Sequence, residues 1–104
     1  MNSKSYHYFF MNLGNKTKLG IILALKNKNM NVSEIVSYLK EEQSNISHHL
    51  KDLILCRIVD AKQVGKQRIY SLNKRTVLPI LKLVEKHSKL NCSRGCNKHC
   101  PGCC

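Results

Sequence analysis

The chain has 104 residues, enough for one modest hydrophobic core and too few for two independent ones. Eighteen lysines and arginines against six acidic residues give a net charge of +12, which indicates a polyanionic partner such as nucleic acid. No apolar run approaches the length of a membrane-spanning helix, and the run near the start is too short for a signal peptide. We therefore expect a cytoplasmic protein with no membrane partner.

Hydrophobic periodicity predicts four helices in the first half of the chain, over residues 3–13, 16–28, 32–40 and 42–55. In the second of them, Leu19, Ile22 and Leu23 form the expected buried stripe, and Lys18 is expected to be a solvated surface charge. The last two helices are separated by a very short turn, and their apolar faces are expected to pack together. That arrangement is typical of a helix-turn-helix.

The pattern changes to alternation after Cys56, so residues 57–72 predict a β-hairpin that turns at Gly65. The expected apolar positions of the hairpin are Ile58, Val64, Ile69 and Leu72. A last helix follows Thr76 and extends over residues 77–90. The sequence thus predicts a mainly α domain with a β-hairpin (α+β) over residues 1–90 and a cysteine-rich tail over residues 91–104.

Two helices over a tight turn followed by a hairpin, in a basic chain, predict a winged helix-turn-helix. Three stretches resemble motifs of the ArsR/SmtB family of metal-responsive repressors. "LGNKTKLGIILAL" from Leu13 resembles "LGDPTRLRILRLL", "QSNISHHLKDL" from Gln43 resembles "QSTVSRHLKVL", and "GKQRIYSL" from Gly65 resembles "GRxVYYRL". Their order and intervals agree across about sixty residues. The resemblance implies a repressor that binds a palindromic DNA operator as a homodimer.

Polar side chains open the predicted recognition helix, where they can reach base edges in the major groove. The base-contact candidates are Gln43, Ser44, Asn45, Ser47 and His48. For Ser44 and Ser47, capping or a phosphate contact is an equal alternative. In the hairpin wing, Lys62, Lys66 and Arg68 are expected to contact phosphates or the minor groove of double-stranded DNA. The alternative for these three is a solvated charged edge that discourages strand pairing.

Family members dimerise through their first and last helices, and the resemblance extends this arrangement to the present chain. The corresponding segments carry more large apolar side chains than a small core would absorb. These are Tyr6, Phe9, Phe10, Ile80, Leu81 and Val84. The alternative is that some of them simply belong to the core.

The two best-known metal sites of the family are absent from this sequence. The family's metal box, "ELCVCDL", aligns with "NMNVSEI", in which Asn31 and Ser33 replace the two cysteines. The last helix offers only Glu85 and His87, which are two residues apart and so do not share a helix face.

Five of the six cysteines lie in the last thirteen residues, "CSRGCNKHCPGCC". Soft thiolates at these short intervals suit Zn, Cd, Cu(I) or As(III). The predicted ligands are Cys92, Cys96, Cys100 and Cys103, with His99 and Cys104 as less certain members. We expect such an ion to be the effector that releases the operator. The sixth thiol, Cys56, is expected to pack as a small apolar residue.

The sequence leaves four alternatives open. A winged-helix regulator could be switched by oxidation of the tail thiols, or could have no effector. A thiol-disulfide enzyme or a metal carrier is less favoured, because the sequence lacks the strand-helix-strand context of a redox fold. No catalytic constellation appears elsewhere, so an enzyme is not expected.

Overall fold

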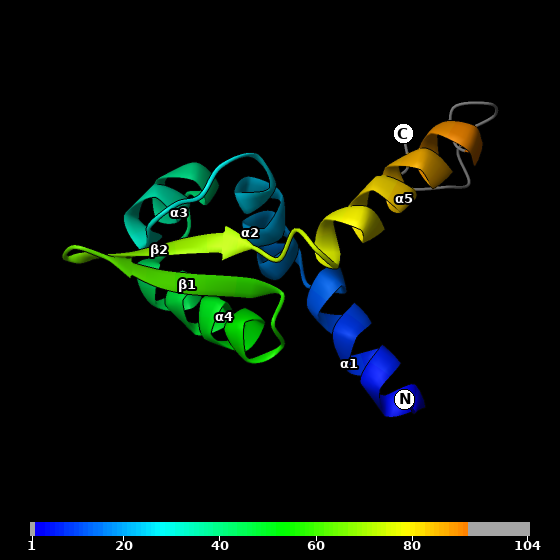
Figure 1. Ribbon diagram of the computed structural model, residues 1–104, viewed down its shortest axis with the longest axis horizontal. Coiled ribbons are helices and arrows are strands. Elements are labelled where there is room, and N and C mark those ends of the chain that lie inside the picture. The colour runs from blue at the N-terminus through cyan, green and yellow to red at the C-terminus, as the bar shows by residue number, and fades with distance from the viewer. Residues whose placement is uncertain (1, 92–104) are drawn as a thin grey trace. The chain divides into compact units, whose positions relative to one another are not determined.

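The computed structural model describes residues 2–91, and the cysteine-rich segment 92–104 lies outside the described residues. The chain divides into two compact units, residues 1–73 and 74–104. The first unit contains α1 (Ser3–Gly14), α2 (Lys16–Asn27), α3 (Val32–Leu39), α4 (Gln43–Leu55), β1 (Val59–Val64) and β2 (Gln67–Leu72) (Figure 1). The second contains α5 (Val77–Asn91). The predicted fold class, mainly α with a β-hairpin, is confirmed.

Asparagine side chains fix the start of the first three helices. Asn2, Asn15 and Asn31 precede α1, α2 and α3, and each accepts a hydrogen bond from the backbone N–H three residues later. These bonds satisfy donors that have no partner within the helix. At the other end of α3, Lys40 adopts the left-handed conformation, with φ of 57°. This residue turns the chain sharply toward α4.

The core of the first unit forms where α2 is enclosed by its neighbours, since α2 contacts α1, α3, α4 and β2. Its fully buried side chains come from α2, α3 and α4, from β1 and from the residue that precedes β1. They include Ile21, Ile22, Leu25, Ile35, Ile46, Leu50, Leu53, Ile58 and Val59.

The predicted stripe on α2 was partly wrong. Leu23 is 44% exposed, whereas Ile21, Ala24 and Leu25 are buried. The buried face is therefore turned away from Leu23, because α2 packs against several elements at once and its burial does not follow one narrow stripe.

The two strands form an antiparallel hairpin in which Val59 pairs with Leu72 and Val64 pairs with Gln67. Gly65 has φ of 63° at the first of the two turn positions, the place where a type II′ turn requires glycine. The turn extends beyond the helices (Figure 1). Val64 lies beside this turn and is 54% exposed. No helix covers that end of the hairpin, so this apolar position of the alternating pattern is exposed.

The segment before α3 joins the hairpin through a single bridge. The N–H of Met30 donates to the carbonyl of Tyr70 at 3.1 Å, and the N–H of Tyr70 donates to the carbonyl of Met30 at 2.8 Å. These bonds tie the base of the wing to the helix-turn-helix. Among residues 2–91, no helix is long and apolar enough to cross a membrane.

Candidate nucleic-acid interface

The recognition helix α4 has one apolar and one polar face. Ile46, Leu50 and Leu53 are buried, at spacings of four and three residues that place them on one face. The five predicted base-contact residues are all exposed: Gln43, Ser44, Asn45, Ser47 and His48. Lys51 is exposed as well, one turn after Ser47. Sequence reasoning missed Lys51, although its spacing from Ser47 and His48 would have placed it on their face.

Polar contacts organise the start of α4. The Nδ2 of Asn45 donates to Oε2 of Glu41 at 2.8 Å, and Glu41 also accepts from the Thr17 hydroxyl. Glu42, the residue that precedes α4, makes no side-chain cap hydrogen bond. A hollow of about 600 Å³ lies here, lined by Lys40, Glu41, Glu42, Ser44, Asn45 and His48. The first turn of α4 is therefore surrounded by groups that can form hydrogen bonds.

The wing residues Lys62, Lys66 and Arg68 are exposed, but they do not share a face. Arg68 pairs with Gln63 and alternates with Tyr70 and the buried Leu72, so it belongs to the face that carries Leu72. Lys62 pairs with Ile69 and belongs to the opposite face.

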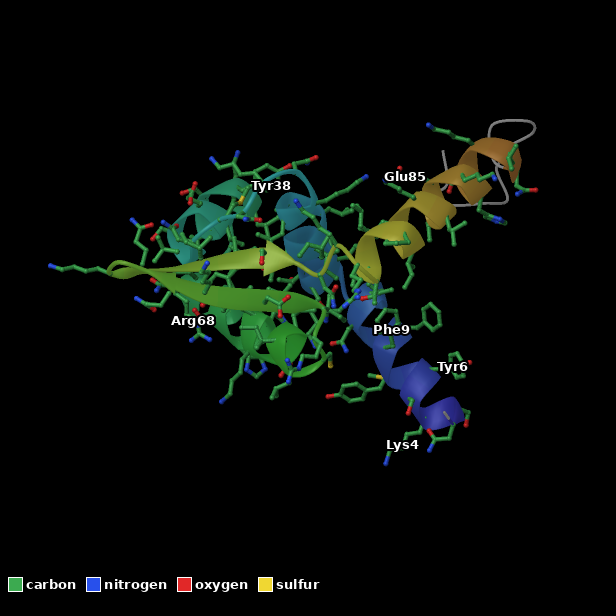
Figure 2. The ribbon with its side chains drawn as sticks, in the orientation of Figure 1. Lys4, Tyr6, Phe9, Tyr38, Arg68 and Glu85 are labelled. Atoms are coloured by element: carbon green, nitrogen blue, oxygen red, sulfur yellow. The ribbon has the colours of Figure 1, made fainter. Side chains whose placement is uncertain are left out.

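Arg68 lies beside the recognition helix α4. Its guanidinium lies 5.8 Å from the centre of the Tyr70 ring. A hollow of about 430 Å³ between α4 and β2 is lined by Arg68 and Tyr70 together with Ser47 and Lys51. Figure 2 shows Arg68 on the side of the hairpin where α4 lies. The structure thus joins Arg68 to the polar face of α4.

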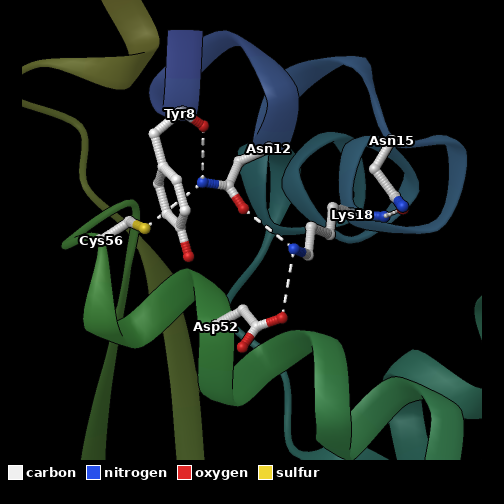
Figure 3. Close-up of polar contacts among 6 residues, drawn as sticks. All are labelled: Tyr8, Asn12, Asn15, Lys18, Asp52 and Cys56. Carbon is white, nitrogen blue, oxygen red and sulfur yellow. Dashed lines mark hydrogen bonds and ion pairs between the residues drawn. The ribbon is translucent and has the colours of Figure 1, made fainter. Parts of the chain in front are cut away.

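A partly buried polar network connects α1 to the recognition helix (Figure 3). Asn12 is only 3% exposed, and its Nδ2 donates to the carbonyl of Tyr8 at 3.1 Å and to the sulfur of Cys56 at 3.3 Å. Lys18 donates to Oδ1 of Asn12 at 3.0 Å and pairs with Asp52 of α4 at 3.2 Å. The expectation of a solvated Lys18 was wrong, since its side chain is 14% exposed.

The position of the family's metal box has a structural role in this chain. Oδ1 of Asn31 accepts from the N–H of Glu34 at 2.9 Å, and the Glu34 carboxylate accepts from the N–H of Asn31 at 3.1 Å. The backbone hydrogen bond with Asn31, and then Lys28, lower the pKa of Glu34 below its usual 4.5. The aligned Ser33 is exposed. A helix cap therefore occupies the place of the two thiolates.

Within residues 2–91, no group of three or more histidine, cysteine, aspartate or glutamate side chains is arranged to hold a metal ion. The predicted ligands lie outside the described residues: Cys92, Cys96, His99, Cys100, Cys103 and Cys104. The chemistry of these donors suits a soft ion. Cys56, which is described, is half-buried and accepts its hydrogen bond from Asn12.

The surface of α1 carries four large side chains that are more than half exposed: Tyr6, Tyr8, Phe10 and Met11. Figure 2 shows Tyr6 projecting outward from the helix. Phe9 is half-buried and makes an edge-to-face contact with Phe10, with ring centres 5.7 Å apart. In α5, Val84 is exposed and Leu81 is buried. Most of the predicted dimer residues therefore remain accessible, and Leu81 does not.

The chain is similar to known transcriptional regulators. Residues 15–61, from the start of α2 into β1, match the family described as bacterial regulatory protein, arsR family. An uncharacterized HTH-type transcriptional regulator of Methanocaldococcus jannaschii is 37% identical over 78 residues, which cover 74% of this chain and 88% of that protein.

Two further relatives extend the comparison. The transcriptional repressor SmtB homolog of Synechocystis is 29% identical over 79 residues, covering 76% of this chain and 60% of that protein. A homodimeric winged helix-turn-helix DNA-binding domain from Mycobacterium bovis superimposes with a TM-score of 0.79 at 19% identity, covering 92% of this chain and 89% of that one. The chain therefore belongs to the arsR family and is a winged helix-turn-helix transcriptional regulator.

Proposed function

We propose that the protein is a homodimeric repressor that binds a palindromic DNA operator, with α4 in the major groove and the hairpin along the adjacent backbone. The observation that carries the proposal is the division of α4 into two faces. One face is buried in the core, and the other exposes hydrogen-bonding side chains from Gln43 to Lys51. A net charge of +12 favours the same partner, because phosphate contacts dominate the affinity of proteins for DNA.

The roles of the individual side chains follow from their positions. Gln43, Asn45 and His48 present groups that can hydrogen-bond base edges, while Ser44 and Ser47 suit either bases or phosphates. Lys62, Lys66 and Arg68 contact phosphates from the wing. Arg68 and Lys51 line one hollow beside α4, so they contact the same stretch of backbone.

The dimer is supported by the exposed aromatic surface of α1. Tyr6, Tyr8 and Phe10 are each more than half exposed, and clustered exposed apolar groups mark interaction surfaces. The Mycobacterium bovis domain of the same fold is homodimeric. A second copy of the chain, placed by α1 and α5, would present two α4 helices to successive turns of the DNA groove.

The effector is a soft metal or metalloid ion bound by the thiolates of Cys92, Cys96, Cys100 and Cys103. The relative named as an SmtB homolog is a transcriptional repressor, and the tail supplies the donors that Zn, Cd, Cu(I) and As(III) prefer. A competing proposal switches the same protein by oxidation of these thiols. The two differ in whether DNA release needs an ion or an oxidant.

DNA binding is tested by selecting sites from random duplexes with the purified chain and measuring affinity across salt concentrations. A palindromic consensus is expected, together with a steep fall of affinity as salt rises. Arg68→Ala should reduce the salt slope by about 1 and weaken binding to all sequences alike. A chain that binds every duplex equally would contradict the proposal of a specific operator.

The effector is tested with a variant in which the four tail cysteines are replaced by serine. We expect it to bind the operator normally, to lose the thiolate absorption bands that Cd produces, and to stay on DNA when Cd or arsenite is added. Cys56→Ser is the matched control and should still be released. Release of the four-serine variant by metal would overturn the assignment, and release of the wild type by peroxide alone would favour oxidation.

A further inference from the structure

Glu41 lies in the turn between α3 and α4, where a negative charge is unfavourable for a protein that approaches phosphates. Its carboxylate is nevertheless bonded on two sides. The Thr17 hydroxyl of α2 donates to its two oxygens at 3.3 and 3.2 Å, and Nδ2 of Asn45 donates to Oε2 at 2.8 Å. Glu41 and Thr17 are half-buried, while Asn45 is exposed. A chain of contacts therefore runs from α2 to the exposed face of α4.

The chemistry of Glu41 fixes which end of the Asn45 amide points outward. An ionised carboxylate has no proton to donate, so only the amide nitrogen can face it. The carbonyl Oδ1 of Asn45 and the second N–H remain free. This is the pair of groups that adenine matches in the major groove, where N6 donates and N7 accepts.

We propose that Thr17 and Glu41 are positioning residues that hold the amide of Asn45 ready to read adenine. The proposal rests on the proposed function, since it assumes that α4 enters the major groove. An exposed asparagine samples several rotamers, and fixing one before binding removes part of the entropic cost of the contact. The hydroxyl of Thr17 holds Glu41, and Glu41 holds Asn45.

The neighbouring Glu42 provides a matched comparison within the same turn. It carries the same charge and is exposed, but it makes no side-chain cap hydrogen bond to α4. Removing either carboxylate weakens the repulsion from DNA phosphates. Only the removal of Glu41 also frees the amide of Asn45.

The test compares base preferences selected from random duplexes by the wild type and by single variants. Asn45→Ala identifies the base position that Asn45 reads. At that position we expect the wild type to prefer adenine by about 10-fold or more, the discrimination of a bidentate contact. Glu41→Ala should lose most of this preference while the other positions keep theirs. Glu42→Ala should raise affinity for all sequences and leave the preference intact.

Variants of Thr17 distinguish the positioning of Asn45 from a direct contact between Glu41 and DNA. Thr17→Val removes the hydroxyl and nearly preserves the shape, so it should lower the adenine preference in the same direction as Glu41→Ala. Thr17→Ser keeps the donor and should restore the preference. Thermal unfolding of each variant shows whether it is folded at the temperature of the selection.

The outcomes separate this inference from the proposed function. A wild type that selects no consensus contradicts the proposed function itself. A wild type with a consensus, whose adenine preference at the Asn45 position survives in Glu41→Ala, overturns the positioning role. The same holds if Asn45→Ala changes no position, or if 7-deazaadenine, which lacks the N7 acceptor, is bound as well as adenine.

Discussion

Helices α1 and α4 expose very different surfaces, although they have similar lengths and belong to the same unit. The exposed face of α4 is polar over its first turns, with Gln43, Ser44, Asn45, Ser47 and His48, while Ile46, Leu50 and Leu53 are buried. On α1 the exposed residues include four large apolar or aromatic side chains, and the buried residue is the polar Asn12. Apart from Leu55, α4 thus exposes polar side chains and buries apolar ones, whereas α1 leaves several large apolar side chains exposed and buries a polar one.

The difference between the two helices shows which of them buries its large apolar side chains within a single chain. Burial of Ile46, Leu50 and Leu53 gives α4 its free energy of folding within one chain. The apolar surface of α1 gains nothing comparable until another surface covers it. We therefore expect substitutions on α4 to act through the core and substitutions on the exposed surface of α1 to act through a partner.

The largest effect is expected from Leu50→Ala on α4. Leu50 is 1% exposed, so its truncation leaves a cavity and should lower the free energy of unfolding by about 2–5 kcal/mol. Leu55→Ala is the control, because Leu55 is 74% exposed on the same helix and its loss should change stability little. Urea titrations of the two variants measure the difference. Equal effects would contradict the packing of α4 described above.

A smaller loss is expected from Asn12→Ala, which removes the link between α1 and α4. The amide of Asn12 accepts from Lys18 and donates to Cys56, and its loss leaves these half-buried groups with fewer partners. We expect the free energy of unfolding to fall by about 1–3 kcal/mol. Asn27→Ala, at the exposed end of α2, is the matched control. Urea titration again measures both variants.

Local pattern predicted the helices and the hairpin closely, because caps, turns and periodicity are encoded by neighbouring residues. Asn31 and Gly65 illustrate this, since each acts within three residues of its own position. The contacts of the candidate site were not predicted. Thr17 and Glu41 are 24 residues apart, and Asn12 and Cys56 are 44 apart, so no local spacing reveals them. Leu23 was misplaced for the same reason, because its exposure depends on which distant elements cover it.

The aromatic surface of α1 is tested with Phe10→Ser. Phe10 is 58% exposed within the chain, so we expect little change in the unfolding of a single chain. The proposed dimer should dissociate more readily, by about 1–2 kcal/mol, because the variant removes aromatic area from its proposed interface. Sedimentation over a range of concentrations measures this. Tyr38→Ser, at an exposed position of α3, is the control. If Phe10→Ser unfolds the chain and leaves the dimer unchanged, α1 is covered in another way.

The smallest effect on stability is expected from the capping box of α3. This helix provides a reference outside the comparison of α1 and α4. The pKa of Glu34 lies below 4.5, so folding favours its ionised form. Its contribution to stability is present above pH 4.5 and is lost as the pH falls through the lower pKa of the folded state. Glu34→Gln keeps a side-chain acceptor for the cap and removes the charge. Urea titrations between pH 3 and pH 6 should therefore show a weaker pH dependence for this variant.

Repeating the titrations at high salt distinguishes the two causes of the lowered pKa of Glu34. The ion pair with Lys28 spans 3.3 Å, but the lysine side chain is 66% exposed, so its contribution is small and screened. The hydrogen bond from the N–H of Asn31 persists in salt. We expect most of the difference between the wild type and Glu34→Gln to remain at high salt. Its complete loss there would mean that Lys28, rather than the cap, holds the carboxylate ionised.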